Sequence, residues 1–413
     1  MKVLITGATG FLGGYVVARL LETTDADVLA VVRGEDPQER LDGGLVHVLG
    51  DWDRSRVVAV PGDLSAGAVH ADVSDVTHVI HSAADVRFDQ SLDDARAINV
   101  NGVRALVELA KQAPKLERFI HVSTAYVAGT HTGEFDEPQL DVGQAFRNTY
   151  EQSKFEAEQL VRSSGLPVRV VRPSIVVGES ATGWTSSFNV LYPPLRALAR
   201  GMVKRVPADP NAIVDVVPVD HVADVILAAL TDTEPVHTYH AVAGESALTA
   251  SELTGLAAHV LHMPEPELDP HGSDLPPGGL EIYAPYFTVK TRFRASRSRE
   301  LGLTPPRLGA YLPRLLTFAD DARWGKKTIQ RERTAAAPTA HVRAERGREG
   351  DATGARQAVA STRIFTWRSL WATSSSKPAS TTSDSGTRSV MIPSVTIVPS
   401  ASIAIVSAKS SGV

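Results

Sequence analysis

Tyr150 and Lys154 stand four residues apart and form the pair in this sequence best suited to moving a proton. Residues 148–161 have apolar residues and alanines at helical spacing, so both side chains share one face of a predicted helix. There the lysine ammonium can lower the pKa of the tyrosine, since a free phenol titrates near pH ~10 and transfers protons poorly at neutral pH. Ser123 and Thr124 end a predicted strand, where Thr124 can hydrogen-bond a carbonyl group. Alone, a Tyr-Lys pair is often a surface pair; with Thr124 it indicates acid–base chemistry on a carbonyl.

A glycine-rich turn near the start of the chain supplies the second chemical feature. Gly7, Gly10 and Gly13 lie between a β-branched apolar run at residues 3–6 and a helical apolar pattern at residues 11–22. The first glycine permits a tight turn, the second lets the backbone approach a pyrophosphate, and the third allows the helix to pack closely on the strand. The anion would lie at the helix N-terminus, where free N–H groups favour negative charge. The spacing predicts a dinucleotide site, to which this segment also contributes Thr9, Phe11 and Leu12.

Arg33 follows the next predicted strand, residues 28–32. At this position, folds of this type that prefer NAD usually carry an acidic residue. An arginine there can pair with the 2′-phosphate of NADP through a charge-assisted contact, and the alternative is a solvated loop arginine. The sequence therefore favours NADP(H) over NAD(H).

Three further strand ends complete the predicted cofactor site. The run 57–60 leads to Asp63 and Leu64, whose loop can reach the adenine, although Asp63 is also typical of a helix N-cap. The run 76–81 leads to small residues that leave room for phosphates and ribose, and the run 168–171 leads to a loop near the nicotinamide. These residues are Ser82, Ala83, Ala84, Pro173 and Ser174. Because the chain has no cysteine and no histidine pair at zinc-ligand spacing, we expect no metal site.

Four stretches of the sequence resemble the extended short-chain dehydrogenase/reductase family. The resemblance is closest to the branch that holds fatty acyl-CoA reductases, male-sterility-type reductases and thioester reductase domains. The stretches are TGATGFLG at 6–13, HSAADVRFD at 81–89, HVSTAYVAGT at 121–130 and NTYEQSKFEAE at 148–158. The first stretch and the Tyr-Lys pair are shared with sugar-nucleotide epimerases, whereas AADVRF and STAYV favour thioester reduction. The resemblance covers residues 1–230 well and residues 230–325 loosely.

The resemblance implies a catalytic triad of Thr124, Tyr150 and Lys154, with Ser123 adjacent and Asn99 holding the catalytic helix or a relay water. An asparagine at a helix start is equally typical of an N-cap. The implied activity is NADPH-dependent reduction of an acyl thioester, carried by CoA or by a carrier protein in trans, to an aldehyde or an alcohol. Two alternatives stay open: a sugar-nucleotide epimerase or dehydratase that retains NAD, and a non-catalytic NADP-binding regulator.

The predicted fold class is α/β. Residues 1–174 form a Rossmann domain with a doubly wound parallel sheet, and residues 175–327 form a smaller α+β substrate lobe whose returning segments complete that domain. Ser and Thr make up 22 of the last 53 residues, and residues 328–413 lack a sustained apolar period. We expect a disordered tail there, so that truncation after Lys327 leaves the enzyme unchanged.

The substrate lobe carries an apolar face and a basic cluster. Apolar residues between 188 and 198 share one helix face, interrupted by two prolines, and Arg200, Lys204 and Arg205 follow. They can hold an acyl chain and a phosphopantetheine or CoA phosphate; core packing and a solvated charged face are the alternatives. Asp220 precedes another helical apolar run and is typical of an N-cap.

Charge and composition argue against several partners. Residues 1–330 hold 31 Lys and Arg against 42 Asp and Glu, a net charge of −11, which disfavours nucleic acid because its binding depends on cationic contacts to phosphate. Residues 389–408 carry no charge but contain prolines and several serines, so we expect no firm membrane insertion. The lack of cysteine and the strand directly after Met1 favour a cytoplasmic enzyme. We also expect that a homodimer can form.

Overall fold

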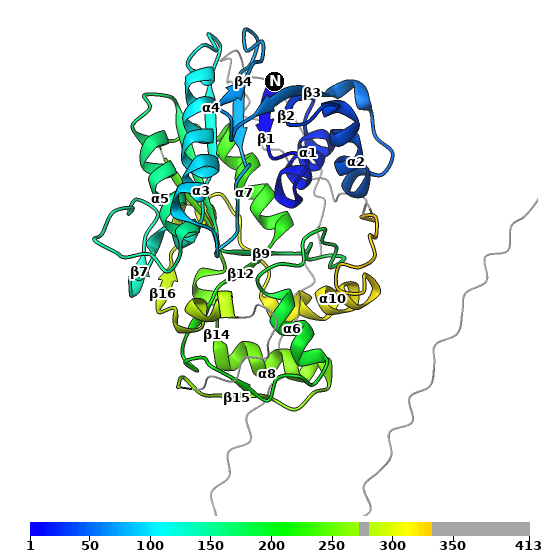
Figure 1. The fold of residues 1–413 in the computed structure, drawn as a ribbon, viewed down its shortest axis with the longest axis vertical. Coiled ribbons are helices and arrows are strands. Elements are labelled where there is room, and N and C mark those ends of the chain that lie inside the picture. The colour runs from blue at the N-terminus through cyan, green and yellow to red at the C-terminus, as the bar shows by residue number, and fades with distance from the viewer. Residues whose placement is uncertain (236, 272–280, 333–413) are drawn as a thin grey trace, which may run out of the picture. The chain divides into compact units, whose positions relative to one another are not determined.

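The computed structural model describes residues 1–235, 237–271 and 281–332, which belong to one compact unit. Figure 1 shows a twisted sheet with helices on both faces and, below it, a group of smaller elements that includes α6, α8 and β14. The larger part contains the doubly wound sheet, and the smaller part is formed mostly by the segment for which a substrate lobe was predicted; that lobe's role in binding substrate stays a prediction. The α/β fold class is confirmed.

The central sheet has eight strands in the order β13-β8-β6-β5-β1-β2-β3-β4. The strands from β13 to β3 pair in parallel, and β4 pairs antiparallel with β3. The chain order reverses between β1 and β5, so the crevice at their carboxyl ends is the place where doubly wound sheets bind ligands. The strands are β1 (Lys2–Thr6), β2 (Asp27–Val32), β3 (Val57–Asp63), β4 (Ala68–Val69), β5 (His78–His81), β6 (Arg118–Val122), β8 (Val168–Pro173) and β13 (Thr238–Ala241).

Helices cover both faces of this sheet, which explains why its strands are continuous apolar runs. On one face lie α1 (Phe11–Thr23), α2 (Pro37–Leu49) and α7 (Val219–Thr231), whose apolar side chains share one core cluster. On the other face lie α3 (Leu92–Arg96), the π-helical segment η2 (Ala97–Asn101), α4 (Gly102–Ala110) and α5 (Thr149–Arg162). Two short 3-10 turns lie in the connections: η1 (Arg54–Arg56) directly precedes β3, and η3 (Ala125–Ala128) follows β6.

Asp220 is not the N-cap that the sequence predicted. Helix α7 begins at Val219, after Pro218, and Asp220 lies within its first turn. Its carboxylate accepts hydrogen bonds from the backbone N–H and the hydroxyl of Ser180, at 3.0 and 2.6 Å. The apolar pattern located the helix, but Asp220 ties α7 to the loop after β9 instead of capping the helix.

The substrate lobe combines short strands and helices around a third core cluster. The two prolines expected to interrupt a helix occupy the first turn of α6, where no backbone donor is lost, so α6 begins at Tyr192. The elements of this part and of its connections are β7 (Gly133–Phe135), β9 (Ile175–Val177), α6 (Tyr192–Ala199), β10 (Arg205–Val206), β11 (Ile213–Val214), β12 (Val216–Pro218), η4 (Gly244–Ser246), β14 (Leu248–Thr249), α8 (Ala250–Leu261), β15 (Glu267–Leu268), η5 (Glu281–Thr288), β16 (Thr291–Phe293), α9 (Ser296–Glu300) and α10 (Leu308–Asp321). As expected, returning segments complete the Rossmann domain, since β13 pairs with β8 and α7 packs on the sheet.

The predicted domain boundary after Lys327 is misplaced. Residues 328–332 lie against the Rossmann domain, where the indole N–H of Trp184 donates to the carbonyl of Ile329 at 3.0 Å. Arg331 as a whole residue, backbone included, is 8% exposed. Its guanidinium donates hydrogen bonds to Glu179, Glu22 and the Tyr15 hydroxyl. Composition misled the prediction because a single buried arginine leaves no periodic signal. The rest of the expected tail, 333–413, lies outside the described residues.

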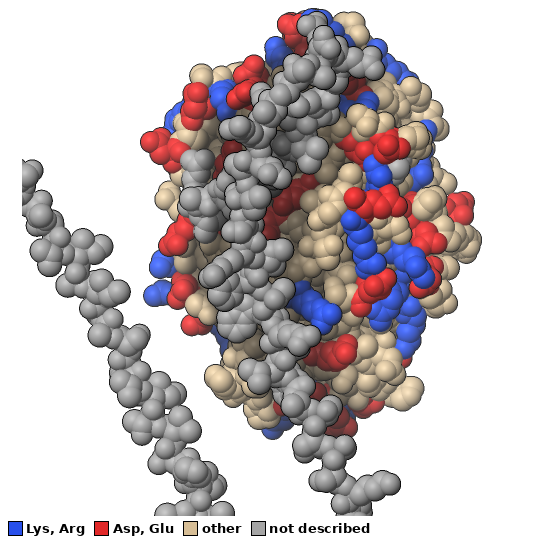
Figure 2. All heavy atoms as spheres, turned by 180° about the vertical axis from the view of Figure 1, so that it is seen from behind, with Lys and Arg blue, Asp and Glu red and all other residues tan. Residues whose placement is uncertain are grey.

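Within the described ranges, no helix is long and apolar enough to cross a membrane. The uncharged stretch 389–408 lies outside those ranges. On the face shown in Figure 2, Lys and Arg side chains lie among Asp and Glu side chains. Ion pairs at the surface of the described residues include Arg294 with Glu134 and Arg299 with Glu245.

Candidate active site

The glycine turn between β1 and α1 forms a cradle that larger residues would fill. Gly7 has φ +80°, and a Cβ there would lie 2.8 Å from the backbone N of Ala83. A Cβ on Gly13 would lie 2.1 Å from the carbonyl O of Gly7, so α1 packs directly on the turn. Gly10 occupies the N-cap of α1 without a side-chain cap. The first-turn N–H groups of α1 are thus available to an anion, as a pyrophosphate requires.

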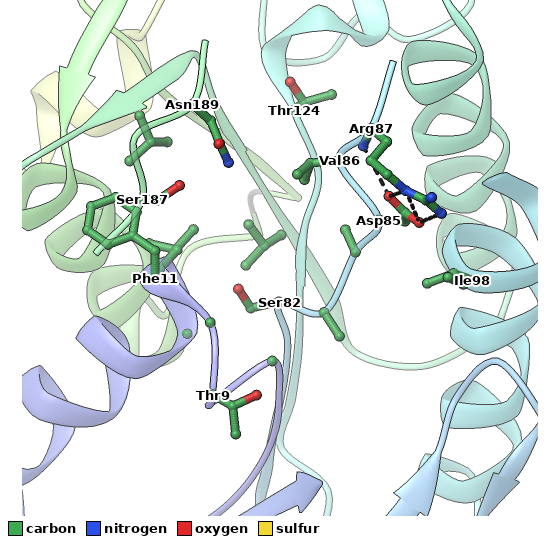
Figure 3. Close-up of a pocket in the computed structure, with 18 of the residues that line it drawn as sticks. Thr9, Phe11, Ser82, Asp85, Val86, Arg87, Ile98, Thr124, Ser187 and Asn189 are labelled. Carbon is green, nitrogen blue, oxygen red and sulfur yellow. Dashed lines mark hydrogen bonds and ion pairs between the residues drawn. The ribbon is translucent and has the colours of Figure 1, made fainter. Parts of the chain in front are cut away.

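A cavity of about 1020 Å³ opens over this turn and runs along the carboxyl ends of the parallel strands. Every residue that the sequence predicted for the cofactor lines it, as do Ser123 and Thr124. Figure 3 shows Thr9 and Phe11 on one side, Ser82 and Thr124 at the strand ends, and Ser187 and Asn189 on the loop that precedes α6. The size and the glycine cradle fit an extended dinucleotide.

Thr124, Tyr150 and Lys154 come together at one end of this cavity. Thr124 lies two residues after the end of β6, accepts the N–H of Tyr126 at 3.2 Å and is 4% exposed. Tyr150 and Lys154 lie one turn apart on α5, whose N-cap Asn148 accepts from the N–H of Glu151. The Lys154 ammonium donates to the carbonyl of Val122 at 2.8 Å, and its burial lowers the pKa to about 8.

The pKa of Tyr150 differs from the sequence expectation. Burial raises it to about 12, and a hydrogen bond with Thr124 opposes part of that rise. The expected lowering by Lys154 is therefore not what this structure shows, because the lysine ammonium is directed to Val122. A phenol with this pKa keeps its proton throughout the neutral range, which suits an acid rather than a base.

Asn99 does not cap a helix; it lies inside η2, between α3 and α4, and is 1% exposed. Its amide accepts from the backbone N–H of Asp85 at 2.8 Å and donates to the carbonyl of the same residue at 2.9 Å. It also donates to the hydroxyl of Ser153, which in turn bonds the carbonyl of Tyr150. Asn99 is absent from the cavity lining and holds the loop after β5 against α5; its role in the active site stays a prediction.

Ser123 faces a buried ionic network. Its hydroxyl donates to Glu158 at 2.8 Å, and Arg172, which is fully buried, pairs with the same carboxylate at 2.7 Å. Arg172 and Arg162 hold the pKa of Glu158 below its usual range in spite of its burial. The serine thus joins β6 to α5 and β8, whereas the hydroxyl of the next residue, Thr124, accepts from the N–H of Tyr126.

Two arginines border the other end of the cavity. Arg33 is exposed after β2, and Arg40 of α2 donates to the carbonyl of Arg33 at 3.3 Å. Both line the cavity, and the sequence reasoning missed Arg40 because it lies on the polar side of a helix pattern. Asp63 ends β3 and accepts from the N–H and hydroxyl of Ser65, which makes a turn and not the expected helix N-cap.

The cavity lining also contains residues that the sequence did not indicate. Tyr283 and Tyr286 of η5 and Val190 before α6 line the same cavity as Tyr150. Their segments match no motif and carry no period, so the sequence offered no signal. The basic cluster predicted to hold a phosphate, Arg200, Lys204 and Arg205, is absent from the cavity lining, and Arg205 pairs with Glu267 at 3.3 Å.

Residues 5–226 match the family model described as male sterility protein, an NAD-binding domain. The chain belongs to this family. It is 35% identical to human fatty acyl-CoA reductase 1 over 278 residues, which are 55% of this chain and 54% of that protein. It is 28% identical to the Drosophila melanogaster fatty acyl-CoA reductase wat over 295 residues, 57% and 56% of the two chains. The chain thus spans about half the length of the curated relatives it matches.

Solved structures share the fold at lower identity. The terminal R domain of the myxalamid biosynthetic pathway matches with a TM-score of 0.68 and 24% identity, covering 79% of this chain and 92% of that domain. UDP-glucuronic acid 4-epimerase from Bacillus cereus, in complex with NAD, matches with a TM-score of 0.59 and 18% identity over 79% and 98%. These solved structures therefore share the fold described above, and the predicted cofactor residues line the cavity at the carboxyl ends of its parallel strands.

Proposed function

We propose that this protein uses NADPH to reduce the carbonyl carbon of an acyl thioester, carried by CoA or by a carrier protein. The observation that carries the proposal is the meeting of Thr124, Tyr150 and Lys154 at one end of a dinucleotide-sized cavity. The similarity to fatty acyl-CoA reductases supports the thioester as substrate. A thiolation-reductase di-domain of similar fold supports a carrier protein as one donor.

The chain's own residues fit the cofactor. The glycine cradle and the first turn of α1 would hold the pyrophosphate, since no side chain intrudes on them. Arg33 and Arg40 would hold a 2′-phosphate at the end of β2, which favours NADPH over NADH. Lys154 would hold a ribose hydroxyl. When bound, the reduced nicotinamide supplies the hydride.

Tyr150 and Thr124 act on the substrate oxygen. Both hydroxyls can donate to the thioester carbonyl, so they stabilise the negative charge that develops as the carbon gains a hydride. Tyr150, protonated at neutral pH because its pKa is about 12, gives its proton to that oxygen. The product is a hemithioacetal. Its C–S bond then breaks, the hydroxyl proton passes to the leaving sulfur, and an aldehyde and a thiol are released.

The test measures NADPH oxidation at 340 nm with three sets of substrates: acyl-CoAs, aldehydes and nucleotide sugars. We expect turnover with acyl-CoAs, and the ratio of NADPH consumed to thiol released distinguishes an aldehyde product (one) from an alcohol product (two). Epimerisation of a nucleotide sugar together with tightly bound NAD would replace the proposal by the epimerase alternative. Binding of NADPH without any turnover would favour the non-catalytic regulator.

A further inference from the structure

A second cavity, of about 120 Å³, lies inside the substrate lobe. Aliphatic and aromatic side chains of α6, α8, β11 and η5 enclose it, among them Leu195, Leu253, Ala257 and Phe287. Its described wall includes no charged residue, and the hydroxyl of Thr254 is turned back to the carbonyl of Ala250 at 2.9 Å. Cavities with such walls stay dry and take apolar ligands.

This cavity adjoins the catalytic one. Tyr126, Ile175, Val190, Tyr283 and Tyr286 line both. Tyr126 is two residues from Thr124 and donates its N–H to the threonine hydroxyl. A substrate whose carbonyl lies between Thr124 and the catalytic tyrosine therefore meets this opening directly.

Packed aromatic rings lie where the two cavities meet. The ring of Phe88 lies 5.7 Å from that of Tyr150 and 5.3 Å from that of Tyr286, measured between centroids. Tyr286 in turn packs edge-to-face on Tyr126 at 5.1 Å. The hydroxyl of Tyr286 accepts from Asn148, which leaves its ring to the apolar side. The path from the reacting carbon to the second cavity is thus lined by aromatic rings, which suits the methylene groups of an acyl chain.

Val190 marks the junction between the cavities and has an unusual backbone. Its φ is +50°, in the left-handed region that β-branched residues rarely adopt. Strain of this kind persists where surrounding structure enforces it, often at ligand sites. The backbone therefore holds the Val190 side chain at the entrance that a substrate chain has to pass.

We propose that this second cavity is an acyl pocket that binds the distal part of the substrate chain and limits its length. The inference rests on the proposed thioester reduction and adds a substrate class: acyl groups of medium length. An apolar cavity of about 150 Å³ holds a benzene molecule with its six carbons, so by the same ratio 120 Å³ holds about five carbons. With the reacting carbonyl and one or two methylenes outside the pocket, octanoyl is the expected optimum.

The test is the kcat/KM of the full chain with NADPH and saturated acyl-CoAs from butanoyl to palmitoyl. Burial of each methylene adds about fourfold in affinity, so kcat/KM should rise by about that factor per carbon up to octanoyl. Beyond decanoyl it should stop rising or fall. A continued rise to palmitoyl, or equal values for all chains, would overturn the acyl pocket while leaving thioester reduction intact. No turnover with any acyl-CoA would instead contradict the proposed function.

Variants of α8 separate the pocket from general effects on folding. Ala257→Leu fills the pocket and should lower the octanoyl to butanoyl ratio of kcat/KM at least tenfold. Leu253→Ala enlarges it and should move the optimum to longer chains by two or three carbons. Leu256→Ala is the matched control, since Leu256 is on the same helix, packs toward Gly309 and is absent from the pocket lining. A shift of the preferred chain length in Leu256→Ala as large as in Leu253→Ala would refute the assignment. Because each ratio of kcat/KM values is taken within one variant, loss of folded protein does not affect that ratio.

Discussion

Replacing Arg331 with alanine should destabilise the protein strongly, although this residue lies beyond every motif. Its guanidinium donates to Glu179 at 2.9 Å, to Glu22 at 3.0 Å and to the hydroxyl of Tyr15 at 3.2 Å. It also lies over the Tyr15 ring at 4.5 Å, and its backbone N–H donates to the carbonyl of His47 at 2.9 Å. These contacts fasten the end of the described chain to α1, to α2 and to the loop after β9.

The magnitude follows from burial. The side chains of Arg331 and Glu179 are each 4% exposed, so solvent screens their interaction little. Removal of one partner of a buried ion pair leaves the other charge without compensation and costs about 3–5 kcal/mol. For a folded unit of this size, about 2 °C of melting temperature corresponds to each kcal/mol. We therefore expect Arg331→Ala to melt about 6–10 °C below the parent.

Thermal unfolding followed by circular dichroism measures this effect, with Lys326→Ala as the control because Lys326 is exposed and five residues away. A second comparison uses two truncated chains, 1–332 and 1–327. The shorter chain loses Arg331 and the Trp184 bond to Ile329, so it should melt at least as low as Arg331→Ala. Equal melting temperatures for the two truncated chains would show that the segment 328–332 adds nothing, as composition alone had suggested.

Three further predictions concern the active site. Tyr150→Phe should lower kcat by about 10²–10⁴ while NADPH affinity, measured by fluorescence titration, stays within a few-fold; kcat within tenfold of the parent would remove Tyr150 from the mechanism. Lys154→Met should abolish activity yet raise the melting temperature at pH 7. The Lys154 pKa is about 8 in the folded protein and 10.5 in the unfolded chain, so the buried charge lowers the free energy of unfolding by about 3 kcal/mol below pH 8, and this penalty fades as the pH rises from 8 to 10.5. A variant that melts lower than the parent at pH 7 contradicts this. Arg33→Asp should shift the NADPH to NADH ratio of kcat/KM about a hundredfold toward NADH, with a further shift when Arg40→Ala is added. An unchanged ratio would mean that Arg33 is a solvated loop residue that does not contact the cofactor.

The Rossmann half could be predicted from sequence because its signals are local. The runs before Gly7 and before Thr124 became β1 and β6, and the pattern around Tyr150 became α5. In a parallel sheet with both faces covered, strands are nearly continuous apolar runs, so their positions follow from composition. Where each run ends, the chain delivers its polar residues to one edge of the sheet, which is why the cofactor residues line one cavity.

The substrate half resisted prediction because its contacts are not local. The acyl pocket draws its wall from α6, α8, β11 and η5, and no single segment reveals it. Arg331 bonds Tyr15 across 316 residues of sequence. When the composition of residues 328–413 is taken as a whole, the Ser- and Thr-rich stretch dominates it and hides the contribution of Arg331. Periodicity reports which face of an element is buried, but not which distant segment buries it.

The sequence spacing of Tyr150 and Lys154 does not determine their protonation states. The interval of four residues correctly places Tyr150 and Lys154 on one helix face, and from that interval the lysine was expected to lower the tyrosine pKa. Burial instead acts on both groups, raising the tyrosine pKa to about 12 and lowering the lysine pKa to about 8. Each shift disfavours the charged form, as desolvation requires. Burial therefore favours the protonated phenol of Tyr150, while the Lys154 ammonium donates to the carbonyl of Val122 and has a proposed role in holding the cofactor ribose.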